Sequence, residues 1–181
     1  MKEKILLHAC CAVCMAYPAE LLKTDYEPVI YFCNPNIYPE QEYLRRRDEL
    51  VRYCEQEDYK YILCDFEPEK WYAYIEGLEN EPEKGSRCNK CFEYRLNQTA
   101  QTARNTGIKF FTTTLTVSPH KVSRNVFEAG KKAAQNYGVE FIEKDFKKQN
   151  GFLRTMEIAK QNDFYRQDYC GCEFSVRKPL L

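Results

Sequence analysis

Glycine, long apolar runs and net charge are all scarce in this sequence. Only 7 of the 181 residues are Gly and 8 are Pro, which excludes collagen-like chains and Pro/Gly-rich disordered ones. No apolar run approaches the roughly 18 residues that a membrane-spanning helix needs, and the apolar stretch after Lys4 is too short for a secretory signal. We therefore expect a globular protein of the cytoplasm with no membrane partner. At roughly 100–200 residues per domain, residues 1–181 form a single domain.

The absence of net charge hides an uneven distribution of charged residues. The 27 basic and 27 acidic side chains cancel, which by itself argues against a nucleic-acid partner. Residues 48–83, however, carry 12 acidic and 3 basic residues, a balance of −9, whereas residues 84–181 carry 9 acidic and 18 basic ones, a balance of +9. This asymmetry favours a positive face that attracts a polyanion. Solvated helix faces of mixed charge explain the same count.

Short runs rich in β-branched and aromatic residues alternate with stretches of helical apolar spacing. Strands are predicted over residues 4–9, 28–33, 59–66, 108–115 and 139–142. Helices are predicted over residues 18–23, 39–56, 68–78, 91–105, 118–137 and 151–162. This alternation predicts an α/β protein, a Rossmann-like three-layer domain whose central, mainly parallel sheet of about five strands is covered by helices on both faces.

Polar and sulfur-containing residues follow the predicted strands. In a parallel α/β sheet the ligand site lies beyond the carboxyl ends of the strands. The residues at these ends are Cys10 and Cys11, then Asn34 and Asn36, then Asp65, and then residues 112–118. The sequence therefore predicts a site at this edge. The segment from Ala9 to Tyr17 has no glycine with which to cradle a phosphate, which argues against ATP or a dinucleotide there.

Cysteine is the residue type in clear excess, with 10 in the chain. Structural disulfides are rare in the cytoplasm, so metal binding or catalysis is the first interpretation. Seven cysteines form three clusters, namely Cys10, Cys11 and Cys14, then Cys88 and Cys91, then Cys170 and Cys172. Two such clusters supply the four sulfurs of a zinc or a 4Fe-4S site. The three cysteine clusters can meet only across the edge of the sheet. A redox-active iron–sulfur centre is therefore favoured over structural zinc, and purely structural thiols are the third interpretation.

The Cys170-Gly171-Cys172 segment differs from the other clusters. A disulfide across so short a ring is strained and easily reduced, which suits two-electron exchange. Two further metal ligands are the alternative. Tyr165, Arg166 and Tyr169 beside it suit stacking and ionic contact with an unpaired nucleotide, although core packing also explains the tyrosines. Three other cysteines lie within apolar runs and are interpreted as small buried hydrophobic residues: Cys33, Cys54 and Cys64.

Five motifs, taken in chain order over nearly the whole sequence, resemble those of the cobalamin-independent epoxyqueuosine reductases, the QueH family. They are Leu6-Leu7-His8-Ala9-Cys10-Cys11-Ala12-Val13-Cys14, Asn34-Pro35-Asn36-Ile37, Arg87-Cys88 with Cys91 and Arg95-Leu96, Thr112-Thr113-Thr114-Leu115 with Ser118-Pro119, and Tyr165-Arg166-Gln167 with Tyr169-Cys170-Gly171-Cys172. The combination is specific, although no single motif is. Val13 stands where the family pattern has Pro.

The resemblance implies the last step of queuosine synthesis, in which the epoxide on the wobble base of tRNA is reduced to an alkene. It implies a 4Fe-4S cluster held by Cys10, Cys11, Cys88 and Cys91. It also implies that Cys170 and Cys172 form a redox-active pair. A second, mononuclear iron beside the cluster would have Cys14 and Asp65 as candidate ligands.

The resemblance also implies partners, which are a tRNA carrying epoxyqueuosine and an external electron donor. Deoxygenation consumes two electrons and two protons, whereas a 4Fe-4S cluster ordinarily passes one electron at a time, so the cysteine pair or a second metal supplies the missing capacity. The general acid is expected among Tyr169, Tyr165 and Asp65. Phosphate contacts are expected from Arg87, Arg95 and Arg166.

Three other functions remain open at the level of sequence. A tRNA sulfur-transfer enzyme also combines an α/β domain with Cys-x-x-Cys motifs, but the glycine-free first loop argues against the ATP activation it needs. A zinc-stabilised RNA-binding protein would use the same cysteines without catalysis. A thiol reductase of small disulfides would need no RNA.

Overall fold

Five short strands at the centre of the molecule form a single sheet. The computed structural model describes residues 2–176. The strands are β1 (Lys4–His8), β2 (Glu27–Phe32), β3 (Lys60–Leu63), β4 (Phe110–Thr113) and β5 (Glu140–Phe141). They pair in the order β3-β2-β1-β4-β5, and every pair is parallel. The predicted parallel α/β fold is confirmed.

β1 lies in the middle of the sheet, and the chain builds outward from it in two directions. Leu6 pairs with Val29 of β2 on one side and with Phe111 of β4 on the other. The chain therefore runs from β1 to β2 and β3, and then crosses back to β4 and β5. The boundary between β1 and β4 is the switch point of the sheet, where open α/β sheets bind their ligands.

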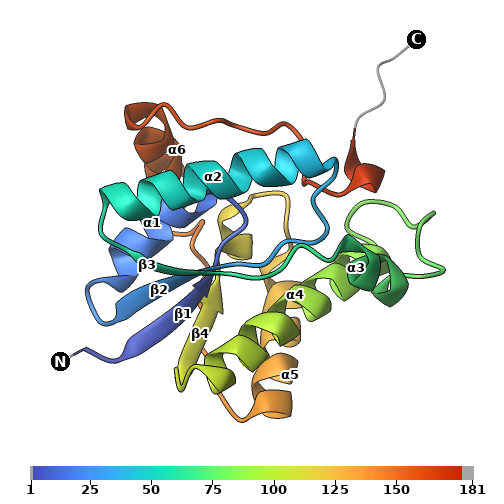
Figure 1. The fold of residues 1–181 in the computed structure, drawn as a ribbon, viewed down its shortest axis with the longest axis horizontal. Helices are drawn as coiled ribbons and strands as arrows, with labels where there is room; N and C mark the ends of the chain where they lie inside the picture. The colour runs from blue at the N-terminus through green and yellow to red at the C-terminus, as the bar shows by residue number, and fades with distance from the viewer. Residues whose placement is uncertain (1, 177–181) are drawn as a thin grey trace.

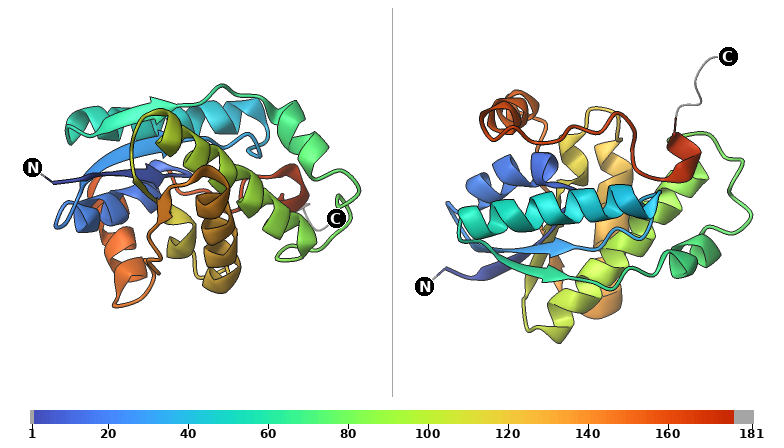
Figure 2. Two further views of the ribbon diagram at one scale, coloured as in Figure 1. Left: turned by 90° about the horizontal axis from the view of Figure 1, so that it is seen from below. Right: turned by 45° about the horizontal axis from the view of Figure 1, so that its top comes forward.

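Helices cover both faces of the sheet, as Figures 1 and 2 show. One layer contains α1 (Ala12–Leu22), α2 (Glu40–Gln56) and α6 (Gly151–Gln161), and the other contains α4 (Ser86–Asn105) and α5 (Ser123–Tyr137). The side chains of β1 alternate between the two layers. Ile5 and Leu7 pack with the α1 layer, and Leu6 packs with the α4 layer. This alternation is the two-residue period of a strand that is buried on both faces.

Three short helices lie at the carboxyl edge of the sheet or beyond it. They are α3 (Pro68–Tyr74) and the 3-10 helices η1 (Thr114–Val117) and η2 (Glu173–Ser175). The segment after α6 crosses from that helix past the start of α2 to reach η2 (Figure 1). Residues from the far end of the chain thereby return to the edge where β1 ends.

Several helix boundaries differ from the prediction. α1 begins at Ala12 and continues through Pro18, whereas the sequence pattern marked only residues 18–23 as part of a helix. α4 begins at Ser86 instead of at residue 91. Gly85 has the extended backbone that precedes a helix, and the helical backbone starts directly after it. The fourth strand ends at Thr113, and α5 begins at Ser123. None of the helices within residues 2–176 is both long enough and apolar enough to cross a membrane.

Candidate thiol-lined active site

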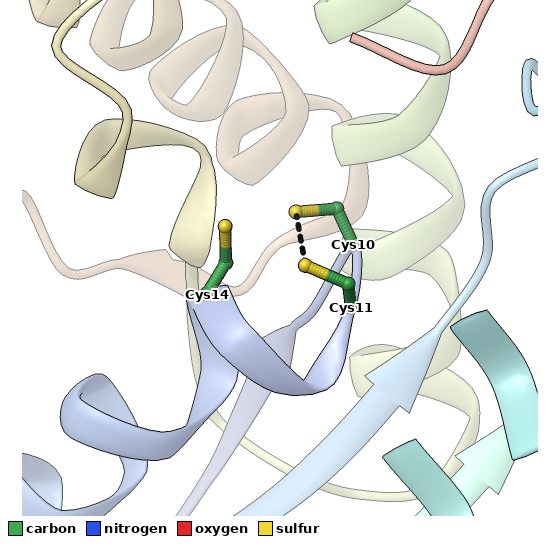
Figure 3. A group of neighbouring side chains, drawn as sticks. All are labelled: Cys10, Cys11 and Cys14. Carbon is green, nitrogen blue, oxygen red and sulfur yellow. Dashed lines mark hydrogen bonds between the residues drawn. The ribbon is translucent and has the colours of Figure 1, made fainter. Parts of the chain in front are cut away.

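The first cysteine cluster lies where β1 passes into α1. Cys11 precedes the first helical residue and has an extended backbone (φ −173°, ψ 168°), and Cys14 lies in the first turn of the helix. The sulfur atoms of Cys10, Cys11 and Cys14, called the triad below, all lie within 4.8 Å of one another. Figure 3 shows the three side chains at the start of α1, with the sulfur atoms of Cys10 and Cys11 3.9 Å apart.

The triad shares a single negative charge. Hydrogen bonds from Cys11 and Cys14 hold the pKa of Cys10 well below its usual value, and the positive charges of Lys121 and Arg95 add to this effect. The bond to Cys10 raises the pKa of Cys11 to about 12, and bonds with both other thiols raise the pKa of Cys14. One thiolate beside two thiols is a donor set for a soft metal, whose binding would release the remaining protons.

His8 fixes the end of β1 directly before the triad. Its Nε2 is 3.3 Å from the carbonyl oxygen of Cys33, and its Nδ1 is 2.8 Å from the hydroxyl of Thr113. A carbonyl only accepts, so Nε2 carries the proton and Nδ1 accepts from the threonine. Burial, with the nearby charge of Arg95, lowers the pKa of His8 to about 3. The ring is therefore neutral and joins β1 to both neighbouring strands.

The remaining clusters meet at the start of α4. Cys88 and Cys91 lie in its first two turns, and because they are three residues apart they share one side of the helix. They line one cavity together with Cys170 and Cys172. These four residues are called the second thiol group below. All ten cysteines are free thiols in the structure.

Two adjoining cavities connect the triad with the second thiol group. Cys10 and Cys14 line the cavity next to that of Cys88 and Cys91, and Cys170 belongs to the walls of both. We call the combined space the thiol cleft. Its triad side measures about 510 Å³, which is within the range of small-ligand pockets. Within residues 2–176, the triad is the one place where three metal-ligating side chains lie this close. The predicted four-cysteine ligand set spans both sides of the cleft and stays a prediction.

A buried arginine holds the Cys170-Gly171-Cys172 segment. Arg46 of α2 is 1% exposed and donates from Nη1 to the carbonyl of Cys170 (3.3 Å), while its Nε donates to Glu42 (2.6 Å). The backbone N–H of Tyr38 donates to the carbonyl of Gly171 (2.8 Å). Gly171 has φ +124°, and a Cβ at this position would lie 3.0 Å from Nη1 of Arg46. The close approach of the two segments therefore requires glycine.

Sequence reasoning missed the role of Arg46, because it stands in the run Arg45-Arg46-Arg47 that resembles a solvated basic face. The helical spacing of this run does indicate that Arg46 is buried. Arg46 is four residues after Glu42, and both belong to the buried side of α2. A charged pair at this spacing on an apolar stripe marks a buried ion pair with a tertiary partner.

The three predicted phosphate-binding arginines have different surroundings. Arg87 is buried, and its Nη1 donates to the carbonyl oxygens of residues 78, 79 and 81. Arg95 is also buried, donates to Asn34 and lines both sides of the thiol cleft. Arg166 is exposed beside Cys14. Arg87 therefore stabilises the loop of residues 78–81. Arg95 and Arg166 line cavities that a ligand can enter.

The three candidate general acids lie in different parts of the structure. Tyr169 lines the thiol cleft, but its hydroxyl donates to the carbonyl of Tyr38. The hydroxyl of Tyr165 donates to Glu42 (3.1 Å). Asp65 is exposed and lines a different cavity, beside Cys33 and Cys64. The structure thus brings Tyr169 to the cysteines and does not bring Asp65 to the triad, because β3, which precedes Asp65, lies two strands away from β1.

Buried polar atoms without a hydrogen-bond partner gather on the α4 side of the thiol cleft. Four of those found in the described part of the chain belong to residues that line this cavity: Asn36 Oδ1, Trp71 Nε1, Arg87 Nε and Arg95 Nε. Three of the four are N–H donors. The residues that line the cavity therefore carry both unpartnered donors and thiols, which suits a group with several acceptor atoms.

The fold and this cleft define a parallel α/β protein with a thiol-based site at its switch point. The family model described as epoxyqueuosine reductase QueH matches residues 5–178. The chain belongs to this family, and the predicted resemblance is confirmed.

Curated relatives of the same name support this assignment over most of their length. Epoxyqueuosine reductase QueH of Acinetobacter baylyi is 39% identical over 177 residues, which cover 97% of this chain and 81% of the relative. The QueH protein of Thermotoga maritima is 33% identical over 178 residues, covering 95% and 90%. The QueH protein of Streptococcus pyogenes is 37% identical over 183 residues, covering 98% and 72%.

Two solved structures share the fold. One is the U34-tRNA thiolase NcsA from Methanococcus maripaludis with its [4Fe-4S] cluster, with a TM-score of 0.58 and 15% identity over 98% of this chain and 63% of that chain. The other is a predicted subunit of a tRNA methyltransferase from Methanocaldococcus jannaschii, with a TM-score of 0.56 and 11% identity over 84% and 73%. At these identities the similarity concerns the fold alone.

Proposed function

We propose that this protein reduces epoxyqueuosine in tRNA to queuosine, as an oxidoreductase. The observation that carries the proposal is the family match over residues 5–178, on a chain whose thiols converge in one cleft. In this reaction the epoxide accepts two electrons and two protons, both C–O bonds break, and the products are an alkene and water.

The residues of the thiol cleft fit an iron–sulfur cofactor. Cys10, Cys11, Cys88 and Cys91 would hold a 4Fe-4S cluster, and the unpartnered N–H donors of the cavity match the acceptor character of its sulfides. When bound, the cluster supplies electrons one at a time. Cys14 is the triad thiol outside this ligand set, and we assign it to a second, mononuclear iron. An external electron donor reduces the cofactor again after each turnover.

The second thiol group gives the chain a two-electron store of its own. When Cys170 and Cys172 form a disulfide, they release two electrons and two protons, which equals what the epoxide consumes. The hydrogen bonds from Arg46 and Tyr38 hold the segment that carries both sulfurs against α2. A short-range disulfide held in this way is easily reduced, so an external thiol or electron carrier regenerates the dithiol.

The cleft also supplies charge and a proton donor. Burial lowers the pKa of Lys121, but the negative potential of Cys170, Cys10 and Cys14 outweighs it and raises the pKa overall. Lys121 therefore remains charged and stabilises the thiolate of Cys10. Burial, with the charge of Glu42, raises the pKa of Tyr169 to about 12, so its hydroxyl keeps its proton at neutral pH. We assign Tyr169 as the general acid, released from the carbonyl of Tyr38 by the substrate.

The wobble base is unpaired in an anticodon loop, so it reaches the cleft without the cost of leaving a duplex stack. Arg95 inside the cleft and Arg166 in the neighbouring cavity beside Cys14 are two cations available to the nucleotide and its neighbours. We therefore expect the substrate to bind on the triad side of the cleft.

The test is anaerobic purification with iron, zinc and sulfide analysis, followed by an assay on tRNA that carries epoxyqueuosine, with a chemical reductant. We expect iron and sulfide in the protein and loss of one oxygen from the modified base, measured by mass spectrometry of the nucleosides. Stoichiometric zinc after strictly anaerobic handling, with no product, would contradict the proposal.

A further inference from the structure

The α4 side of the thiol cleft holds two buried N–H donors that have no strong acceptor in the described chain. Trp71 is 1% exposed, and its indole N–H meets the thiol of Cys91, which is a weak acceptor. Its ring packs edge-on against Tyr72, at 5.1 Å between ring centres, and belongs to one buried cluster with Cys91 and Cys172. The donor is therefore fixed in position next to the sulfurs.

Arg87 provides the second fixed donor. Its Nη1 is committed to the carbonyl oxygens of the 78–81 loop, and the guanidinium lies over the ring of Phe174 at 4.8 Å. These contacts leave Nε buried and unpartnered, in a residue that lines the same cavity as Cys88 and Cys91.

An unmet buried donor costs about 1–3 kcal/mol, and native proteins rarely leave several at one place. The cost disappears if the cavity holds an acceptor in the functional state. Cysteine thiols are weak acceptors, whereas thiolates and sulfides that carry cluster charge are strong ones. The two donors and the two thiols of α4 thus point to one acceptor-rich group between them.

We propose that the indole N–H of Trp71 and the Nε–H of Arg87 donate hydrogen bonds to sulfur atoms of an iron–sulfur cluster held at Cys88 and Cys91, and that these bonds raise its reduction potential. The inference rests on the proposed function, because it requires the cluster. Reduction adds negative charge to the sulfurs, so N–H donors stabilise the reduced form more than the oxidised form. Trp71 and Arg87 are positioning and tuning residues that do not touch the substrate.

The first test compares Trp71→Phe with wild-type protein, both purified anaerobically with the cluster. The variant keeps an aromatic ring in the same buried place and loses only the N–H. We expect a lower midpoint potential in a redox titration monitored by electron paramagnetic resonance. Tyr74→Phe is the matched control, because it removes a hydrogen-bond donor from the same short helix, one that bonds to Glu93 outside the cleft. Its potential should equal that of the wild type, and equal potentials in Trp71→Phe would overturn the proposal.

A second test needs no variant and therefore does not depend on folding of the substituted protein. The chain contains one Trp, so growth with tryptophan labelled with nitrogen-15 in the indole marks Nε1 alone. Pulsed paramagnetic resonance of the reduced wild-type cluster should show coupling to this nucleus. A wild-type protein that holds iron and sulfide without such coupling defeats only this inference. A wild-type protein that holds no cluster defeats both the inference and the proposed cofactor.

Discussion

The two thiol groups of the cleft are built in different ways. The triad comes from five consecutive positions, and the junction of β1 with α1 is enough to bring its sulfurs within 4.8 Å. The second thiol group joins the start of α4 to a segment about 80 residues further along the chain, and the buried guanidinium group of Arg46 in α2 holds that segment. The difference teaches that the triad depends on local backbone and the second group on tertiary contacts.

The largest expected effect comes from breaking the triad itself. In Cys11→Ser the backbone stays intact but a soft sulfur donor becomes a hard hydroxyl. We expect activity to fall by at least about 100-fold, together with loss of iron and sulfide, since even residues that only support metal ligands typically cost 10–100-fold. Both quantities are measured on anaerobically purified protein.

Cys64→Ser is the matched control for this variant. It changes a partly buried cysteine that follows β3, two strands away from β1, and lines a different cavity. Normal metal content and activity are expected. Equal losses in the two variants would show that any lost cysteine disturbs the protein, and the special role of the triad would have to be abandoned.

An intermediate effect is expected where the second thiol group is held. In Gly171→Ala the added Cβ lies 3.0 Å from Nη1 of Arg46, at a backbone φ of +124°. The strain is about 1–3 kcal/mol and is relieved by moving the segment between Cys170 and Cys172. We expect about a tenfold loss of turnover with little change in metal content, because the proposed cluster ligands are untouched. Turnover is followed on tRNA with excess reductant.

Gly107→Ala is the control that introduces backbone strain at a site away from the cysteine segment. Gly107 also has a positive φ, +69°, but nothing lies within 4 Å of the added Cβ. We expect a similar loss of thermal stability with unchanged turnover. If both alanine variants have normal turnover, the contact between Arg46 and the cysteine segment does not matter for the reaction.

The smallest effect concerns binding on the triad side. Arg166 is exposed near Cys14, whereas Arg87 on the other side is occupied by its loop. Arg166→Gln should weaken tRNA binding and reduce the slope of log affinity against log salt by about one unit. Lys109→Gln, which removes an exposed charge at the opposite edge of the sheet, should leave the slope unchanged. Titrations at several salt concentrations decide this, and equal slopes for Arg166→Gln and wild type would move the tRNA contact elsewhere.

The sheet and its functional edge were predictable because their signals are local. Apolar runs marked the five strands, and the residues after them marked the carboxyl edge, where Cys10 and Cys11 indeed lie. The start of α4 was not predictable in this way. The acidic segment with Pro82 and Gly85 resembles a loop, and the contacts that Arg87 makes with that loop at the start of the helix have no sequence signature.

Side-chain direction was the other feature that the sequence did not reveal. Arg46 and Arg87 carry the same charge as solvated arginines, and only the packed structure shows that both are buried and bonded to backbone carbonyls. Asp65 follows a strand as predicted, yet it faces another cavity. The single Trp attracted no functional interpretation, because an isolated buried donor has no sequence signature.

The central position of β1 has a consequence for synthesis of the chain. The triad is synthesised before the rest of the cleft, but β1 gains its second neighbour only when β4 has been made, and Cys170 follows later still. At about 5–20 residues per second, the triad thiols spend on the order of 10–30 s outside a completed cleft. During this interval no folded wall shields them from oxidants, so the nascent chain depends on the reducing capacity of its surroundings.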